Sequence, residues 1–184
     1  MTLYIIAGAN GSGKTTFAKE FSKKQNFEFI NADEIAKDLD KDNLTKYKVK
    51  AGKIFFEKFK NSLQLDKSFI IETTLSGKYL VKYIEKAKKL NFRVVLIYLF
   101  LENPQTNIER IKNRVFNGGH YVPNQDVIRR FYRSKDLFCS IYKDIVSSWS
   151  IYYNSNEIFE KIADNKLVFD VEKYNKFKEN STCK

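Results

Sequence analysis

The stretch Gly8-Ala9-Asn10-Gly11-Ser12-Gly13-Lys14-Thr15 decides the fold, because it fits the pattern G-x-x-x-x-G-K-[ST]. Three of the chain's seven glycines lie inside it. The apolar run 3–7 before it predicts a buried strand, and residues 16–21 after it predict a helix with Phe17 and Phe21 on one face. A strand, a glycine turn and a helix N-terminus direct several backbone N–H groups at one point, where the helix dipole also favours an anion. The stretch is therefore predicted to be a phosphate-binding P-loop.

The side chains of this loop predict a nucleotide site. Lys14 can reach the β- and γ-phosphates, and the Thr15 hydroxyl can hold Mg²⁺, so we expect ATP and Mg²⁺ as cofactors. A glycine loop that only turned the chain would need neither residue. The residues expected to contact the nucleotide are Gly8, Ala9, Asn10, Gly11, Ser12, Gly13, Lys14, Thr15 and Thr16.

Length and composition predict one globular domain. The chain has 184 residues, of which 43% are hydrophobic and 30% charged, and it contains no apolar run of transmembrane length. We expect a single domain over residues 1–180, a disordered tail over 181–184 and a cytoplasmic location. Cys139 in a helical pattern and Cys183 in the expected tail predict neither a disulfide framework nor a metal cluster.

The net charge of +11 comes mostly from lysine. Only six of the 33 basic residues are arginine, and the lysines are spread along the whole chain. This distribution favours a solvated surface over a nucleic-acid groove, and we expect neither a nucleic-acid nor a membrane partner. Five of the six arginines instead cluster between residues 110 and 133, and the planar guanidinium group suits phosphate.

Strand and helix patterns alternate along the chain. Strands are expected at 27–30, 68–73, 93–100 and 149–154, with residues 167–169 as a possible edge strand. Helices are expected at 33–39, 49–63, 77–92, between Pro104 and Pro123, and from 124 to about 147. This order predicts an α/β P-loop NTPase fold with a doubly wound, mostly parallel sheet, helices on both faces and a helical lid. Ligands then bind beyond the carboxyl ends of the strands.

Two acidic residues follow predicted strands at that rim. Asp33 can accept a proton from, or orient, a hydroxyl that attacks the γ-phosphorus, although it could also be a helix N-terminal acid. Its neighbour Glu34 is better explained as a first-turn helix acid. Glu72 could organise Mg²⁺ through water, bind the acceptor or face solvent, and Thr73 beside it could bind substrate or cap a helix. No acidic residue ends the 94–100 strand.

The arginine cluster predicts a phosphoryl-transfer lid at about residues 103–135. Negative charge spreads over the γ-phosphate oxygens during transfer, and an arginine stabilises it. We expect Arg114 and Arg130 to act in catalysis, with Gly118-Gly119 as the hinge. The alternative is an ordinary charged helix face. His120, the only histidine, is interpreted as a loop residue without a catalytic role.

The order of these motifs resembles the zeta-toxin-like P-loop kinases, also described as predicted ABC-type ATPases. The blocks that carry the resemblance are 7–16, Phe29-Ile30-Asn31-Ala32-Asp33-Glu34-Ile35, Ile71-Glu72-Thr73-Thr74-Leu75-Ser76-Gly77, 118–123 with 128–131, and 149–155. The resemblance implies ATP-Mg²⁺ on Lys14 and Thr15, Asp33 as base, Glu72 near the acceptor, and arginines on the transferring phosphate. It also implies a UDP-linked N-acetyl amino sugar as acceptor and a small antitoxin as partner.

The function predicted from the sequence is therefore an ATP-dependent kinase that acts on a hydroxyl of a small, anionic substrate. Two alternatives stay open. A kinase for RNA or other polynucleotide ends would use the positive charge and would bind oligonucleotides in a salt-sensitive way. A nucleotide-binding regulatory module would bind ATP without transferring phosphate.

Overall fold

The structure is a computed structural model that describes residues 1–40, 44–119, 121–155 and 158–183. The strands are β1 (Thr2–Ala7), β2 (Glu28–Ile30), β3 (Phe69–Thr73), β4 (Arg93–Phe100), β5 (Ser148–Ser155) and β6 (Ile158–Asp164). The helices are α1 (Lys14–Gln25), α2 (Ala32–Leu39), α3 (Leu44–Gln64), α4 (Val81–Lys89), α5 (Pro104–Phe116), α6 (Asn124–Leu137), the π-helical turn η1 (Phe138–Tyr142), α7 (Lys143–Ile145) and α8 (Val171–Lys178).

The strands form one six-stranded sheet in the order β2-β3-β1-β4-β5-β6. The pairings from β2 to β5 are parallel, and β6 runs antiparallel to β5. The P-loop strand β1 lies between β3 and β4, with Ile6 opposite Glu72 on one side and Ile97 on the other. The predicted mostly parallel α/β sheet is confirmed, and the carboxyl ends of β1 and β3 lie together.

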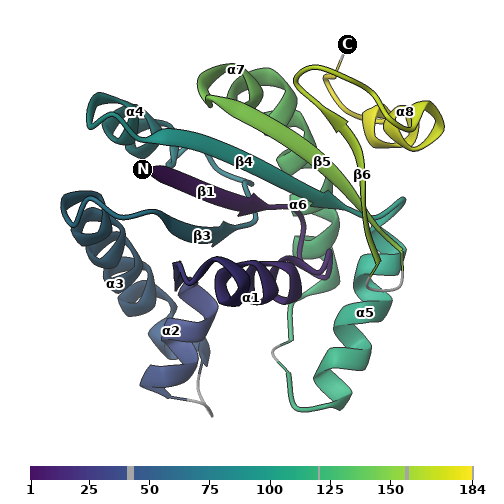
Figure 1. The fold of residues 1–184 in the computed structure, drawn as a ribbon. Helices are drawn as coiled ribbons and strands as arrows, with labels where there is room; N and C mark the ends of the chain where they lie inside the picture. The colour runs from purple at the N-terminus through teal and green to yellow at the C-terminus, as the bar shows by residue number, and fades with distance from the viewer. Residues whose placement is uncertain (41–43, 120, 156–157, 184) are drawn as a thin grey trace.

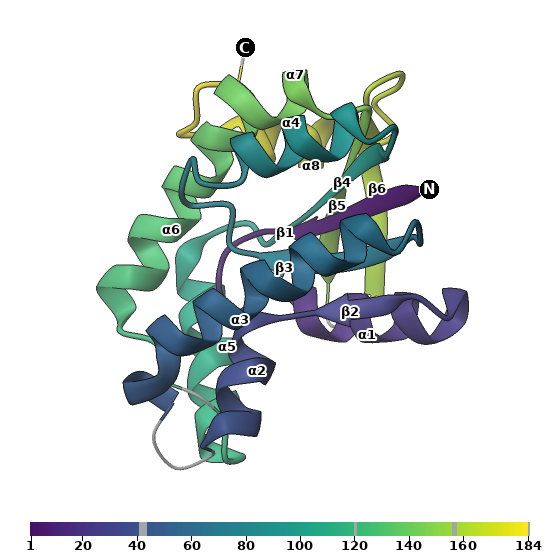
Figure 2. The same ribbon diagram turned by 90° about the vertical axis from the view of Figure 1, so that its left-hand side faces the viewer.

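Helices cover both faces of the sheet (Figures 1 and 2), with α1 on one face and α4, α7 and α8 on the other. Because successive strand residues point to opposite faces, Ile5 and Ile6 enter different cores. Ile6 packs with Ala18 and, at the margin, Phe17 of α1. Ile5 belongs to the larger core, to which α3, α4, η1 and α8 contribute.

Helices α5 and α6 have a small core of their own. It contains Ile108, Ile111, Val122 and Val127, and Val115 packs against it. The region expected to form a lid is therefore held together by contacts that are separate from the two sheet cores.

The carboxyl-terminal part differs from the sequence prediction. The edge strand is β6, not 167–169, where only Val168 forms an isolated bridge with Ala163. Charged residues such as Glu160 and Lys161 hide the strand pattern of β6, but they are well tolerated at a sheet edge. Helix α8 was not predicted either. The Asp170 side chain caps it by accepting from the Lys173 N–H at 2.9 Å.

The expectation that the two cysteines form no disulfide is wrong, because Cys139 and Cys183 are bonded, with their Cα atoms 5.0 Å apart. Helix α8 inserts the fully buried Phe177 into the core to which η1 also contributes, and this packing brings the carboxyl-terminal segment next to η1. The Thr182 N–H then donates to Asp136 Oδ1 at 2.9 Å. Residues 181–183 are thus held against α6 and are not the disordered tail expected from the sequence.

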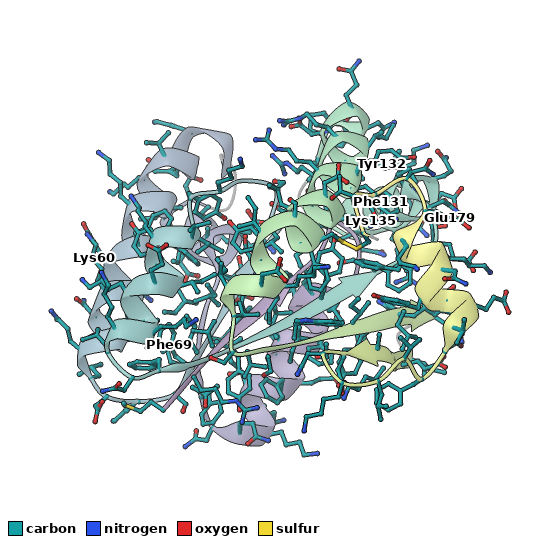
Figure 3. The ribbon with its side chains drawn as sticks, turned by 90° about the horizontal axis from the view of Figure 1, so that it is seen from above. Lys60, Phe69, Phe131, Tyr132, Lys135 and Glu179 are labelled. Carbon is teal, nitrogen blue, oxygen red and sulfur yellow. A yellow bond between two sulfur atoms is a disulfide. The ribbon has the colours of Figure 1, made fainter. Side chains whose placement is uncertain are left out.

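Figure 3 shows Lys135 on α6 near the carboxyl end of α8, where its ammonium donates to the Glu179 backbone oxygen at 2.8 Å.

None of the described helices has the length and apolar character needed to cross a membrane.

Candidate nucleotide and phosphoryl-transfer site

The loop between β1 and α1 requires glycine. Gly8 has φ 140°, and a Cβ there would lie 2.1 Å from the Leu99 backbone oxygen. Gly13 has φ 90°, and a Cβ there would lie 2.2 Å from Asn154 Nδ2. A side chain at residue 8 would collide with the β4 backbone, one at residue 13 would collide with the Asn154 side chain, and the positive φ is strained for any other residue at both positions. The loop is therefore packed tightly between β4 and β5.

Gly13 also ends this loop as the N-cap of α1. It has no side chain to occupy the first backbone N–H groups of the helix, and no acidic residue lies in the described first turn. These N–H groups and the helix dipole remain available to a bound anion.

Lys14 and Glu72 form a buried pair at the base of the loop. Lys14 Nζ donates to the Ala9 backbone oxygen at 2.8 Å and lies 3.8 Å from Glu72 Oε1. Burial lowers the pKa of Lys14, while the carboxylates of Glu72 and Asp33 oppose that shift. Burial likewise raises the pKa of Glu72 against the effect of Lys14. Both charged groups are shielded from water, so a further ion of opposite charge would stabilise the charged form of each.

Glu72 also connects the P-loop to α2. It accepts from the Thr15 hydroxyl at 2.9 Å and from Asn31 Nδ2 at 2.6 Å, both at Oε2. The Asn31 side-chain oxygen in turn caps α2, accepting from the N–H of Asp33 at 2.7 Å and of Glu34 at 3.3 Å. One buried asparagine therefore joins the Thr15–Glu72 pair to the helix turn that carries Asp33.

Two cavities meet at this rim. The larger one, of about 590 Å³, contains the P-loop residues Asn10, Gly11, Gly13, Lys14, Thr15 and Thr16. The smaller one, of about 200 Å³, is lined by Ala32, Ala36, Thr74, Val122, Pro123, Asp126 and Arg130. Asn10 and Asp33 line both cavities, and Glu72 lines the larger one. Asp33 thus stands at the boundary between a phosphate-binding space and a second, smaller space.

The arginine cluster divides between these cavities. Arg110 and Arg114 line the larger cavity. Arg130 lines the smaller one and donates to Asn10 Oδ1 at 3.0 Å. Arg129 pairs with Asp126 at 2.7 Å and lines neither described cavity, and Arg133 is exposed on α6.

Other predicted residues have local roles. Glu34 pairs with Lys19 of α1. Thr73 is buried, and its hydroxyl bonds to Tyr79 Oη at 2.8 Å and accepts from the Leu75 N–H at 3.0 Å. It lines neither described cavity, whereas its neighbour Thr74 lines the smaller one. Gly8, Ala9 and Ser12 belong to the loop but do not line the larger cavity, and His120 lies outside the described residues.

Sequence reasoning did not identify the asparagines that brace the loop. Asn107 Nδ2 of α5 donates to the Asn10 backbone oxygen at 2.7 Å, and Asn154 Nδ2 of β5 donates to the Ser12 oxygen at 2.9 Å. Asn154 also lines the larger cavity together with Phe159 of β6. No local spacing marks these residues, because their partners are backbone oxygens 97 and 142 positions away.

A family model, AAA_33, described as an AAA domain, matches residues 3–134, from β1 into α6. The chain belongs to the AAA_33 family. An uncharacterized protein of Haemophilus influenzae (strain KW20 Rd) is 31% identical over 128 residues, which are 70% of this chain and 90% of that protein.

Solved structures share the fold of this AAA_33 chain. The native AvrRxo1-ORF1:-ORF2 complex matches with a TM-score of 0.78 at 16% identity over 97% of this chain, which spans 64% of the matched chain. The same complex with ATP matches with a TM-score of 0.76 at 17% identity, and the match covers 98% of this chain and 63% of the matched chain. The PezAT toxin-antitoxin structure of Streptococcus pneumoniae matches with a TM-score of 0.69 at 18% identity, and the match covers 98% of this chain and 78% of the matched chain. The fold expected from the resemblance to zeta-toxin-like P-loop kinases is thus confirmed.

Proposed function

We propose that this protein is an ATP-dependent kinase that transfers the γ-phosphate of ATP to a hydroxyl group of a small molecule. The observation that carries the proposal is the position of Asp33, in the wall shared by the two cavities. A kinase needs a phosphate donor and an acceptor on opposite sides of such a group. A module that only bound ATP would need neither the second cavity nor a carboxylate at the junction.

The larger cavity fits a nucleoside triphosphate. The N-terminus of α1 and Lys14 supply positive charge at one end, and Arg110 and Arg114 line the same space. A fold neighbour crystallised with ATP supports this assignment. Arg114 and Arg130 are proposed to stabilise the charge on the transferring group from the two sides of Asp33.

The donor set near Lys14 also fits Mg²⁺. The Thr15 hydroxyl, supported by Glu72, would hold the ion together with phosphate oxygens and water. The described residues contain no group of three or more His, Cys, Asp or Glu that could hold a metal. The ion would supply charge neutralisation at the phosphates.

The proposed chemistry is a single displacement. Asp33 accepts the proton of the acceptor hydroxyl as the hydroxyl oxygen bonds to the γ-phosphorus. The bond from that phosphorus to the β,γ-bridging oxygen breaks, and its electron pair leaves with ADP. The products are the phosphate monoester, ADP and one proton on Asp33, which is exposed and returns the proton to water.

The test uses ATP labelled at the γ-phosphate and an ultrafiltered metabolite extract. The wild-type protein is expected to form a labelled small molecule whose mass has increased by one phosphate. Asp33→Asn should retain ATP binding and lose about 10²-fold or more of the transfer rate, because general-base catalysis contributes factors of that size. Asp38→Asn, an exposed change on the same helix, is the control. Transfer that persists in Asp33→Asn would reject the proposed role of Asp33, and no product at all would reject the kinase.

A small protein partner is a further part of the proposal. Two fold neighbours are the AvrRxo1-ORF1:-ORF2 complex and the PezAT toxin-antitoxin system. The partner would inhibit transfer by covering the cavities. If the neighbouring gene product, when co-expressed, neither copurifies with the protein nor lowers its activity, this part is rejected.

A further inference from the structure

The smaller cavity, called here the acceptor cavity, limits what the kinase can phosphorylate. It lies between α2, the turn after β3 and the start of α6, and it shares the lining residues Asn10 and Asp33 with the nucleotide cavity. On the proposed function, the acceptor hydroxyl must reach Asp33, so the rest of the acceptor occupies this cavity.

We infer that the acceptor is a compact hydroxylated molecule without phosphate, nucleotide or net negative charge, such as a polyol, a monosaccharide or an amino alcohol. The inference rests on the proposed kinase activity. It replaces the anionic substrate expected from the sequence, and it excludes the UDP-linked amino sugar that the family resemblance implies.

The first argument is size. As bounded by the described residues, the acceptor cavity measures about 200 Å³, against about 590 Å³ for the nucleotide cavity. A nucleotide-linked sugar has roughly forty non-hydrogen atoms and belongs with ligands whose pockets measure about 300–1,000 Å³. A molecule the size of a single sugar ring fills the acceptor cavity.

The second argument is charge. Among the described lining residues, the charged side chains are Asp33, Asp126 and Arg130, and Asp126 is paired with Arg129 at 2.7 Å. The Arg130 guanidinium is engaged by the wall, because it donates to Asn10 Oδ1 at 3.0 Å and lies 3.7 Å from Asp126, and the proposed function assigns it to the transferring phosphate. An anionic acceptor would therefore meet the Asp33 carboxylate and an arginine that already has other partners.

The third argument is the chemistry of the remaining wall. The Thr74 hydroxyl and the Asp33 carboxylate provide hydrogen-bond acceptors, which match hydroxyl or ammonium donors. Ala32, Ala36, Val122 and Pro123 provide apolar surface for a short carbon skeleton. Both features suit a polyhydroxy compound.

The first experiment separates the acceptor by charge. The metabolite extract is passed over an anion exchanger at mildly alkaline pH, and each fraction is incubated with the protein and γ-labelled ATP. UDP-N-acetylglucosamine is assayed alongside as a defined anionic probe. The expected result is an Asp33-dependent product from the flow-through fraction only. A product from the retained fraction or from UDP-N-acetylglucosamine would overturn the inference and leave the kinase standing, whereas no product from the unfractionated extract would reject the kinase itself.

The second experiment fills the acceptor cavity. Ala36→Leu adds three carbons at a residue that is 4% exposed, and Lys37→Leu places the same side chain at the next, exposed position of α2. Transfer should fall about 10²-fold in Ala36→Leu, because displacement of a reactant by about 1 Å has an effect of that size, and should be unchanged in Lys37→Leu. The affinity for an ATP analogue and the midpoint of thermal unfolding show whether Ala36→Leu folds. A folded Ala36→Leu protein with normal transfer contradicts the inference. If it does not fold, Ala32→Val probes the same cavity with a smaller side chain, and the same two outcomes decide.

Discussion

At the scale of single residues, the site depends on side chains that satisfy two partners at once. Asn31 is the clearest case, because its amide N–H reaches Glu72 while its oxygen caps the helix turn of Asp33. A serine at this position would still cap α2, but it lacks the amide nitrogen that reaches Glu72, and its hydroxyl lies closer to the backbone. The two roles of Asn31 can therefore be separated by substitution.

We expect Asn31→Ser to lower the transfer rate about 10- to 100-fold, because a hydrogen bond to a charged group contributes about 1.5–3 kcal/mol. The Mg²⁺ concentration needed for half-maximal rate should rise as well, since Glu72 supports Thr15. The matched control is Asn103→Ser, which changes the cap of α5 in the same way at an exposed residue. Equal effects in both variants would show that Asn31 acts only as a helix cap.

The lowered pKa of Lys14 predicts how ATP binding depends on pH. Its protonated form binds phosphate, so affinity should fall as the pH rises through a value below the 10.5 of an ordinary lysine. Titration with a fluorescent ATP analogue between about pH 7 and about pH 10 measures this change. In Lys14→Met the affinity should be about 10- to 100-fold weaker at neutral pH and should no longer respond to the titration of residue 14. A wild-type affinity that stays constant over this range contradicts the assignment.

At the scale of helices and strands, the disulfide joins the carboxyl terminus to η1. It closes a loop across a sequence separation of 44 residues, for which the chain-entropy relation gives about 4 kcal/mol. Cys183→Ser should therefore lower the free energy of unfolding in urea by up to about 4 kcal/mol. Reductant should destabilise the wild-type protein by a similar amount and leave Cys183→Ser unchanged. If reductant affects both proteins equally, the bond is not the cause.

Some of the helices and strands could be predicted from the sequence, and others could not. Strand β4 has the bounds predicted from the sequence, residues 93–100. A continuous apolar run is typical of a central parallel strand that is buried on both faces. Strand β6 and helix α8 were not predicted. Charged residues interrupt the apolar pattern of β6 at the sheet edge and that of α8 at the surface. In the site, Lys14, Thr15, Asp33 and Glu72 stood in recognisable motifs. Asn107 and Asn154 did not, because they act on backbone oxygens of a distant segment.

At the scale of the whole molecule, the P-loop joins parts of the chain that otherwise have separate cores. Asn107 attaches it to the α5–α6 unit, Asn154 attaches it to β5, and Glu72 attaches it to β3 and α2. Lys14 and Glu72 meanwhile remain buried with few ionic partners. A triphosphate with its Mg²⁺ would give Lys14 an anionic partner and Glu72 a cationic one, and it would contact elements from both halves of the sheet. Nucleotide binding should therefore stabilise the entire domain and not the loop alone.

This argument predicts a shift in thermal unfolding. At a free ATP concentration of about 100 times the dissociation constant, binding to the native state adds about 2.7 kcal/mol. For a domain of this size each kilocalorie raises the unfolding midpoint by about 2–4 °C, so a rise of about 5–11 °C is expected. Lys14→Met, whose affinity is expected to be about 10- to 100-fold weaker, should gain only about 0.4–1.4 kcal/mol at the same ATP concentration, which corresponds to a rise of about 1–6 °C. Asp33→Asn should keep the full rise, because Asp33 faces the acceptor and is not needed to hold the phosphates. If the rise in Asp33→Asn were as small as in Lys14→Met, the aspartate would belong to nucleotide binding, and the separation of donor and acceptor cavities would be wrong.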